Sequence, residues 1–354
     1  MVAPVGGAAA QAGPGVSAGG VPAESSFSAP THCTHSRARD FDFWIGEWDV
    51  LNRQRPPEGV GFYETGRSTD RVYPVVGGCG IVEHWRGDAF RFILGFSIRA
   101  YDPAEDEWTI VLLWPTNGRP SFGELRGGFR HGRGEFSFQW VRPDGDTATN
   151  RFTFSDITPN SLRWENATSR DGGLTWMGNW VMEFTRRDPV SDIGLWNGPT
   201  MTTRRCPAEE YRRFDGQLGE WAGVRTTPAG DSIPLRAHFV RILEGCAVME
   251  RVWSPDGDYE AFRVRAYEPD ADRWVLYELD SERRTLVRRE AEGRDSPDFR
   301  EVAVGDGQAT RLRWEAGADG APGWVMETAD DANGPWRMSA AVRLEQPIGG
   351  VDGT

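Results

Sequence analysis

The sequence predicts an all-β protein that consists of two tandem antiparallel β-barrels. Three observations support this prediction: an internal repeat, apolar residues that alternate with polar ones, and turn-forming residues at short intervals. The chain of 354 residues is long enough for two domains. Its formal charge of −13 argues against a nucleic-acid or anionic-membrane partner. All 40 basic residues are arginine, so chemistry that depends on a lysine amine is excluded.

The internal repeat sets the number of barrels. The segment Phe41–Trp48 (FDFWIGEW) recurs as 214–221 (FDGQLGEW). A Gly-Cys pair followed by a glutamate occurs at 78–83 and again at 245–250, and a third marker, RAYDP, recurs as RAYEP. Because the markers keep their order and a nearly constant offset, two homologous copies produced by an internal duplication are the simplest explanation.

Within each copy the pattern is typical of strands. In the segment 108–114 the apolar side chains of Trp108, Ile110, Leu112 and Trp114 share one face. Turn sequences such as Asn-Gly and Pro-Asp-Gly separate these runs. A copy of about 140 to 150 residues fits one closed barrel of roughly eight to ten strands. A short helix is expected before each barrel, most clearly in 207–214, where proline can occupy the first turn.

Composition places the domain boundaries. Residues 1–30 are rich in Gly, Ala, Pro and Ser and predict a disordered tail. The barrels are expected at 31–187 and 206–347, joined by a linker at 188–205. No apolar run reaches the roughly 18 residues of a spanning helix. Because no secretory signal is recognisable, a cytoplasmic location is expected, or a secreted or periplasmic one if the start site hides a signal.

At Gly46–Trp48 and Gly219–Trp221 the sequence resembles the lipocalin, or calycin, group, whose first strand carries Gly-x-Trp. The opening motif FDFWxGEWDV, with the later motifs of copy one, resembles a bacterial lipocalin-like family. This resemblance implies lipocalin-like barrels in which the tryptophan closes the base against an arginine of the last strand, and Arg186 and Arg343 are the candidates. It implies little about activity, because the architecture includes carriers, haem proteins, carotenoid hydratases and pericyclic cyclases.

The four cysteines occupy matched positions in the two copies. Cys33 and Cys206 each lie eight residues before the FD motif, and Cys79 and Cys246 follow equivalent glycines. This arrangement suggests the disulfides Cys33–Cys79 and Cys206–Cys246, which need an oxidising compartment. The missing signal favours reduced, buried thiols instead, and both alternatives stay open. No metal site and no cofactor are expected.

Glu83 and Arg99 are the candidate catalytic residues. If Glu83 faces the barrel interior, burial would raise its pKa and make it a general acid or base. The alternative is a structural ion pair between Glu83 and Arg99, which Glu250 and Arg265 repeat in copy two. Because recurrence favours a structural role, residues found in only one copy are better functional candidates. These are His84, Trp114, His131, Trp140 and Trp180 in copy one and Tyr259, Tyr277, Glu278 and Asp280 in copy two.

The sixteen tryptophans suggest an aromatic binding pocket, since small-ligand sites are concave and mostly apolar. Such rings suit a flat or polyunsaturated molecule. The candidate ligand-binding residues are His84, Trp85, Trp108, Trp114, Trp164, Trp180 and Tyr277. The alternative is that these rings form packed core and the interface between the barrels.

Three functions follow as hypotheses. In the first, a barrel binds a small hydrophobic or aromatic molecule and, as an enzyme of secondary metabolism, cyclises, isomerises or hydrates it without a cofactor, with Trp114 as a cavity wall. In the second, it is a non-catalytic carrier or sensor for a lipid, pigment or haem. Candidate haem ligands are His84, His131 and His238. In the third, both barrels are filled and the protein is a structural or interaction module. No motif of a serine hydrolase, zinc protease or dinucleotide enzyme occurs, and the oligomeric state stays open.

Overall fold

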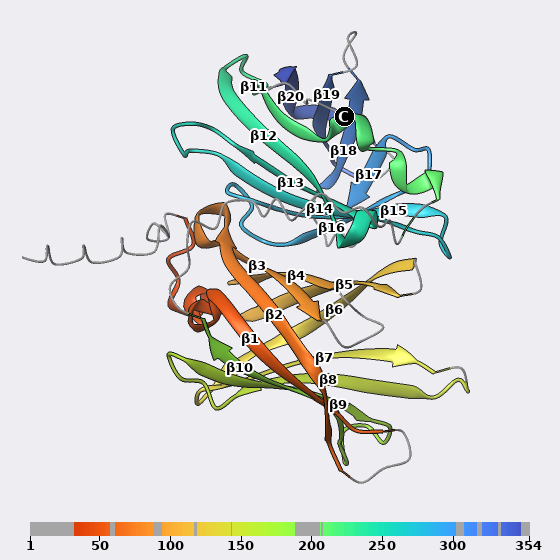
Figure 1. Cartoon of the computed structure of the whole chain (residues 1–354). Coiled ribbons are helices and arrows are strands. Elements are labelled where there is room, and N and C mark those ends of the chain that lie inside the picture. Colours follow the sequence, from red (N-terminus) through yellow and green to blue (C-terminus); the bar gives the residue numbers. More distant parts are fainter. Residues whose placement is uncertain are drawn as a thin grey trace, which may run out of the picture.

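The computed structural model shows an all-β protein with two closed barrels in tandem (Figure 1). It describes residues 32–56, 61–87, 94–116, 119–142, 144–187, 206, 208–301, 308–316, 321–331 and 334–347. The predicted tail at 1–30 and linker at 188–205 lie outside these residues. The prediction of two antiparallel barrels, each preceded by a short helix, is confirmed, and each barrel has ten strands.

The N-terminal barrel follows two short 3-10 helices, η1 and η2. Its elements are η1 (Ser36–Arg39), η2 (Asp42–Trp44), β1 (Gly46–Gln54), β2 (Tyr63–Val75), η3 (Val76–Gly78), β3 (Gly80–Gly87), β4 (Leu94–Asp102), β5 (Glu107–Thr116), β6 (Arg119–Arg130), β7 (Arg133–Val141), β8 (Thr147–Ser155), β9 (Ser161–Ser169) and β10 (Met177–Arg186). Each strand pairs with the next along the chain, and β10 closes the barrel against β1.

The C-terminal barrel repeats this order. Its elements are η4 (Glu209–Arg212), η5 (Asp215–Gln217), β11 (Gly219–Thr226), β12 (Ser232–Ile242), η6 (Leu243–Gly245), β13 (Ala247–Trp253), β14 (Glu260–Glu268), β15 (Arg273–Asp280), β16 (Val287–Ala291), β17 (Asp298–Glu301), β18 (Ala309–Ala316), β19 (Pro322–Ala329) and β20 (Arg337–Pro347). Strand β20 closes this barrel against β11.

Strand alternation decides which side chains enter the first barrel. On β1, Trp48, Val50 and Asn52 are buried, whereas Asp49 and Arg53 are exposed. Successive side chains of a strand point to opposite faces, so the buried set faces the interior. The same rule places Glu83 and Trp85 of β3 inside and His84 outside.

The base of the N-terminal barrel is closed by Trp48 and Arg186. These residues are opposite each other on β1 and β10, and the guanidinium carbon of Arg186 lies 4.0 Å from the centre of the Trp48 ring. Arg186 also donates hydrogen bonds of 2.7 Å to the carbonyls of Ile45 and Phe43. This contact confirms the predicted partner of Trp48.

The corresponding prediction for the C-terminal barrel is wrong. Trp221 lies opposite Pro347 on β20, while Arg343 is exposed and pairs in register with Val224. A register irregularity lies between Ala222 and Gly223 of β11. Arg343 therefore does not reach the tryptophan at the base.

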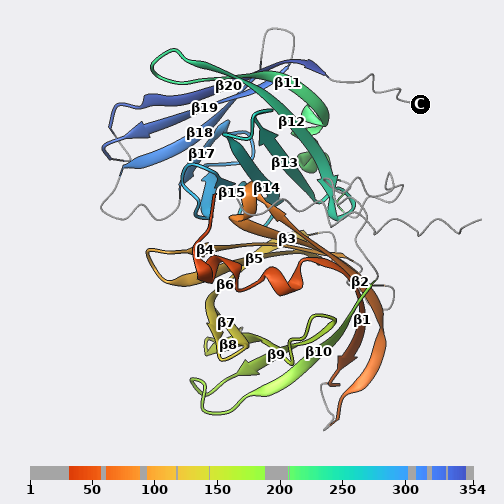
Figure 2. The ribbon, with the colours of Figure 1, turned by 90° about the vertical axis from the view of Figure 1, so that its left-hand side faces the viewer.

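The two barrels pack against each other along the outer faces of β3–β6 and β13–β15 (Figures 1 and 2). Nearly every residue of β4, β14 and β15 is buried, because one face meets the barrel interior and the other meets the neighbouring barrel. The approach is close at Gly80, where a Cβ atom would lie 2.4 Å from Leu279. Tyr73 donates a 3.7 Å hydrogen bond to the sulfur of Met249 across the same interface.

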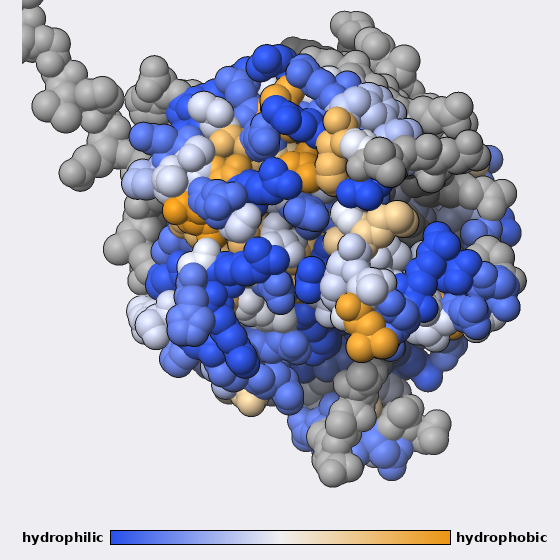
Figure 3. All heavy atoms as spheres, turned by 90° about the horizontal axis from the view of Figure 1, so that it is seen from below, coloured by the Kyte–Doolittle hydropathy of each residue, from blue (hydrophilic) through white to orange (hydrophobic). Residues whose placement is uncertain are grey.

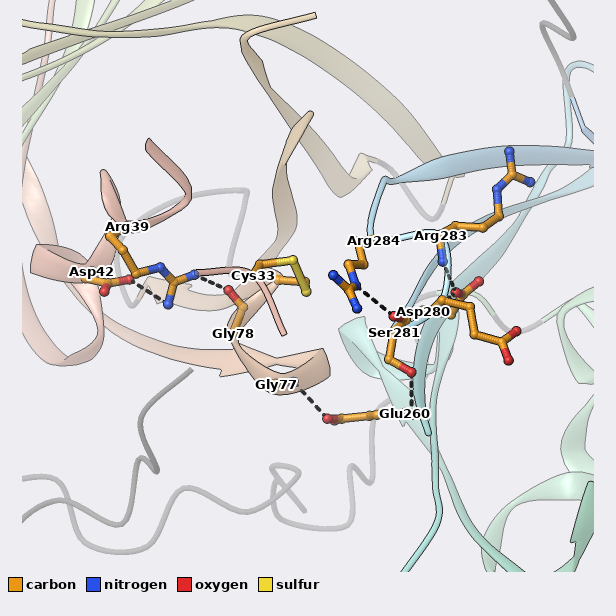
Figure 4. Close-up of a disulfide and its surroundings, with 12 residues drawn as sticks. Cys33, Arg39, Asp42, Gly77, Gly78, Glu260, Asp280, Ser281, Arg283 and Arg284 are labelled. Carbon is orange, nitrogen blue, oxygen red and sulfur yellow. Dashed lines mark hydrogen bonds and ion pairs between the residues drawn. A yellow bond between two sulfur atoms is a disulfide. The ribbon is translucent and has the colours of Figure 1, made fainter. Parts of the chain in front are cut away.

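Two disulfides tie the segment that precedes each barrel to the turn before its third strand. Cys33 is bonded to Cys79, and Cys206 is bonded to Cys246. Next to the first disulfide, the backbone N–H of Gly77 donates a 3.0 Å hydrogen bond to Glu260 of the other barrel (Figure 4). The disulfide therefore lies where the two barrels meet.

The face of the N-terminal barrel that lies away from its neighbour is mostly hydrophilic, and hydrophobic residues appear there in separate groups (Figure 3). Among the described residues, no helix is both long enough and apolar enough to cross a membrane.

Candidate functional site

A buried polar layer lies inside the N-terminal barrel. Arg99 of β4 donates to Glu83 of β3 at 2.7 Å and to the hydroxyl of Ser97 at 2.5 Å, and this hydroxyl donates to the same Glu83 oxygen. The guanidinium carbon of Arg99 also lies 3.8 Å from the centre of the Trp44 ring. Burial lowers the pKa of Arg99 to about 10, so it stays protonated at neutral pH. The structure thus brings the two predicted catalytic residues together as an ion pair.

Asp70 of β2 adds a second carboxyl group to this layer. It is 2% exposed, and its carboxyl group interacts with the carboxyl group of Glu83 and with the backbone at Arg71. Burial raises the pKa of Asp70 well above its usual range, and the nearby Glu83 raises it further, while Arg99 opposes the shift. One arginine cannot neutralise two buried carboxylates, and this favours the protonated form of Asp70.

Above this polar layer, four tryptophans from β3, β5, β9 and β10 form a contiguous cluster, which we call the tryptophan cluster: Trp85, Trp114, Trp164 and Trp180. The ring of Trp180 lies 5.8 Å from that of Trp85, 6.0 Å from that of Trp114 and 5.4 Å from that of Trp164, centre to centre. A Cβ atom on Gly95 would lie 2.7 Å from the Trp114 ring, so the glycine lets this ring lie against the barrel wall. Four of the seven predicted ligand-binding residues therefore meet at one place.

The tryptophan cluster reaches the end of the barrel opposite the base. Trp114 and Trp180 are only partly buried, whereas Trp85 and Trp164 are buried. Trp180 donates a 3.1 Å hydrogen bond to the side-chain oxygen of Asn52. The indole N–H of Trp85, in contrast, is buried without a partner in the described part of the chain.

Three of the predicted ligand-binding residues lie elsewhere. Trp108 packs at the base, 4.9 Å from the ring of Phe41. Tyr277 is on the outer face of β15, where its hydroxyl donates a 3.2 Å hydrogen bond to Glu124 of the other barrel. His84 is on the outer face of β3 and shares a 2.9 Å hydrogen bond with the hydroxyl of Tyr73.

His84 lines a small groove between the barrels. The groove has a volume of about 120 Å³, and its other walls include Arg71, Arg86 and Arg187 of the N-terminal barrel and Leu243 of η6. Burial, with a smaller effect of Arg71, lowers the pKa of His84 to about 3, so the imidazole is neutral. The groove is too small for a drug-sized ligand.

None of the three histidines that were candidate haem ligands faces the interior of a barrel. His84 faces outward, His131 is exposed in the turn between β6 and β7, and His238 alternates with the inward Phe239 on β12. Trp140, another residue found only in copy one, is 39% exposed near the end of β7. The three histidines therefore do not contribute to the interior of either barrel, whereas Trp140 lies on the same face of β7 as the buried Phe136.

The matching positions of the C-terminal barrel carry different chemistry. Across β3, β4 and β5 the paired residues are Glu83, Ser97 and Leu112. Across β13, β14 and β15 they are Glu250, Arg263 and Glu278. The C-terminal barrel therefore carries two charged residues, Arg263 and Glu278, where the N-terminal barrel carries a serine and a leucine.

Comparisons with known proteins show distant likenesses. No family model and no curated protein matches the sequence. Similar solved structures include the S-type phycobiliprotein lyase CPES from Guillardia theta, with 12% identity and a TM-score of 0.32 over 44% of this chain and 96% of that one. EF1p2_mFAP2b bound to DFHBI has 13% identity and a TM-score of 0.24 over 43% and 100%. A protein of unknown function from the DUF3598 family of Nostoc punctiforme has 10% identity and a TM-score of 0.24 over 89% and 100%. Likenesses this distant do not bear on function.

Two residues of the site, Asp70 and Asn52, were not among the residues predicted from the sequence. Asp70 is two residues from the buried Val72 on β2, so alternation alone could have placed it inside the barrel. Asn52 has the same relation to Val50 on β1. The register between β2 and β3, which sets Asp70 opposite Trp85 and near Glu83, carries no local signal.

Proposed function

We propose that the N-terminal barrel binds a small, flat, hydrophobic molecule with one polar group. The observation that carries this proposal is an indole N–H that is buried without a partner among the described residues, beside a buried carboxyl group in an aromatic interior. Asp70 and Trp85 are register partners on β2 and β3, both are buried, and the N–H is that of Trp85. An unpaired buried polar group costs about 1–3 kcal/mol, so a ligand oxygen that accepts from this N–H would recover this energy.

The tryptophan cluster supplies the apolar surface for such a ligand. Aromatic rings pack well against flat molecules and contribute large apolar contact area. In the described structure the four rings contact one another, so a ligand has to displace one of them. Trp180 is the ring that moves, because it is only partly buried and lies at the end of the barrel opposite the base.

Binding of 2-naphthol, followed by isothermal titration calorimetry, tests the proposal. Naphthalene is the matched probe without a hydroxyl, and we expect it to bind about tenfold more weakly. Trp85→Phe keeps an aromatic ring but removes the N–H, and should weaken 2-naphthol binding while leaving naphthalene binding within about twofold. Trp253→Phe is the control, because Trp253 lies on β13 of the other barrel. If 2-naphthol does not bind, or binds Trp85→Phe as tightly as the unmodified protein, the proposal is wrong.

The same geometry supports proton-transfer chemistry, with Asp70 in the acid role that the sequence suggested for Glu83. A protonated Asp70 faces the tryptophan cluster, and Glu83 is its charged neighbour. Asp70 can give its proton to C4 of cyclohex-3-enone, and the resulting carboxylate can take a proton from C2, so that the double bond moves from C3–C4 to C2–C3 and Asp70 is protonated again without a cofactor. Conversion of cyclohex-3-enone to cyclohex-2-enone, measured by ultraviolet absorption, tests this step. Asp70→Asn should abolish conversion, and a protein that binds 2-naphthol but converts no enone would be a carrier.

We also propose that the protein works in an oxidising compartment. The two disulfides support this, because such bonds persist in secreted, periplasmic or lumenal proteins and are rare in the cytosol. Labelling of free thiols in protein taken directly from its native cells tests the location. No label should enter without a reductant, and four labelled thiols would favour the cytoplasm.

A further inference from the structure

The interior of the C-terminal barrel contains a cavity of about 180 Å³. Its walls combine buried charged residues with an apolar surface. Residues of β14, β16, β19 and β20 contribute to it, among them Arg263, Arg289, Trp324, Ala340 and Val342. Small-molecule sites have this character: mostly apolar walls with a few polar groups that fix the orientation of the ligand.

A chain of ion pairs forms the polar wall. Arg263 donates to Glu250 at 2.5 Å and to Glu278 at 2.6 Å, and Arg289 donates to the other oxygen of Glu278 at 2.9 Å. The side chains of all four residues are at most 1% exposed. Although burial opposes it, these arginines lower the pKa of Glu278 to about 2, so Glu278 is a carboxylate.

Only two of the three guanidinium nitrogens of Arg289 donate hydrogen bonds to described residues. Its Nε donates to Glu278 and its Nη1 donates to the hydroxyl of Thr310 at 2.6 Å. Its Nη2 is buried and has no hydrogen-bond partner among the described residues. A buried guanidinium nitrogen without an acceptor is costly, so an acceptor in the cavity would be bound strongly.

The cavity has a path to solvent. Glu282 and Arg283, which also line it, are exposed in the turn after β15. This turn begins at Asp280, whose side chain accepts hydrogen bonds from the backbone N–H groups of Glu282 and Arg283. Ser281 of this turn accepts a hydrogen bond from the backbone N–H of Glu260, whose side chain accepts one from Gly77 of the N-terminal barrel (Figure 4). The opening therefore lies near the junction of the two barrels.

We propose that the C-terminal barrel is a second binding site, selective for a small carboxylic acid with a body about the size of one aromatic ring. One carboxylate oxygen accepts a hydrogen bond from Nη2 of Arg289, and the apolar body packs against Trp324 and Val342. This site differs in kind from that of the N-terminal barrel, where the corresponding interior positions carry a serine and a leucine. The N-terminal barrel thus binds a largely apolar ligand, and the C-terminal barrel binds an anion.

Phenylacetate is the probe, and its uncharged analogue phenylacetamide is the matched control, both titrated by calorimetry up to about 10 mM into the full-length protein. We expect saturable binding of phenylacetate and at least about tenfold weaker binding of phenylacetamide. An excess of 2-naphthol should not displace phenylacetate, because the two probes occupy different barrels. Displacement, equal binding of acid and amide, or no binding of phenylacetate would each overturn the proposal.

Two variants place the acid within the cavity. Arg289→Lys keeps a positive charge beside Glu278 but removes the Nη2 donor, and should weaken phenylacetate binding about tenfold or more. Ala340→Leu fills the cavity without touching the ion pairs and should abolish binding. Arg311→Lys is the matched control, since Arg311 pairs with Glu327 in the same barrel outside the cavity walls. Unchanged affinity in either cavity variant, with circular dichroism showing a folded protein, would overturn the assignment.

Discussion

Replacement of Arg99 by methionine tests whether the polar layer of the N-terminal barrel depends on its ion pair. Arg99 is 1% exposed and provides the charged partner of Glu83, and its guanidinium also stacks on Trp44. Methionine fills similar space without the charge. The carboxylate of Glu83 then remains buried beside Ser97 with no counterion.

The expected loss of unfolding free energy follows from these contacts. Breaking one side of a buried ion pair costs about 3–5 kcal/mol, because the remaining charge has left water without compensation. The lost cation–π contact with Trp44 adds about 0.5–2 kcal/mol. We therefore expect Arg99→Met to lose about 4 kcal/mol or more. The double variant Glu83→Gln/Arg99→Met removes both charges and should recover about 2 kcal/mol of this loss.

Urea unfolding followed by circular dichroism, with both disulfides intact, measures these differences. Arg133→Met is the control, because Arg133 and Glu135 form an exposed pair whose loss should cost no more than about 0.5 kcal/mol. A loss below about 1 kcal/mol in Arg99→Met would refute the reasoning. A double variant that is less stable than Arg99→Met would also refute it, because the unpaired Glu83 carboxylate would then not be the cause of the lost stability.

Three further predictions concern the base, the disulfide and one surface turn. Cys33→Ala/Cys79→Ala should lose about 4 kcal/mol in urea unfolding, because the bond closes a loop of 46 residues; no loss would mean that the loop is ordered without the bond. Arg186→Lys should lose about 1–3 kcal/mol in the same assay, since lysine cannot donate to the carbonyls of Pro159, Ile45 and Phe43 together; an unchanged midpoint would contradict this. Hydrogen bonds from Thr175 lower the pKa of Asp171 to about 2. The stabilisation that Asp171 gives its turn is therefore present above about pH 4 and is lost as the pH falls through 2. In a nuclear magnetic resonance titration, Thr175→Val should raise this pKa towards 4, and an unchanged value would refute the assignment.

Part of the candidate site could be predicted from the sequence. The alternation of β3 placed Glu83 and Trp85 on one face and His84 on the other, and the structure has them there. The matched positions of the cysteines suggested the same two pairs that the structure joins. Asp70 was missed, since its meeting with Glu83 depends on how neighbouring strands align, which no local pattern encodes.

The sequence by itself determined the number of barrels, the turns between strands and the inward face of most strands, because repeats, turn residues and period-two alternation are local properties of the chain. Only the tertiary structure decided which inward residues meet across a closed barrel and which outward residues the other barrel covers. Tyr277 illustrates the second case: its strand is buried on both faces, and its hydroxyl reaches Glu124, more than a hundred residues away. Such contacts join residues far apart in the chain, so they arise only when both barrels have closed and packed together.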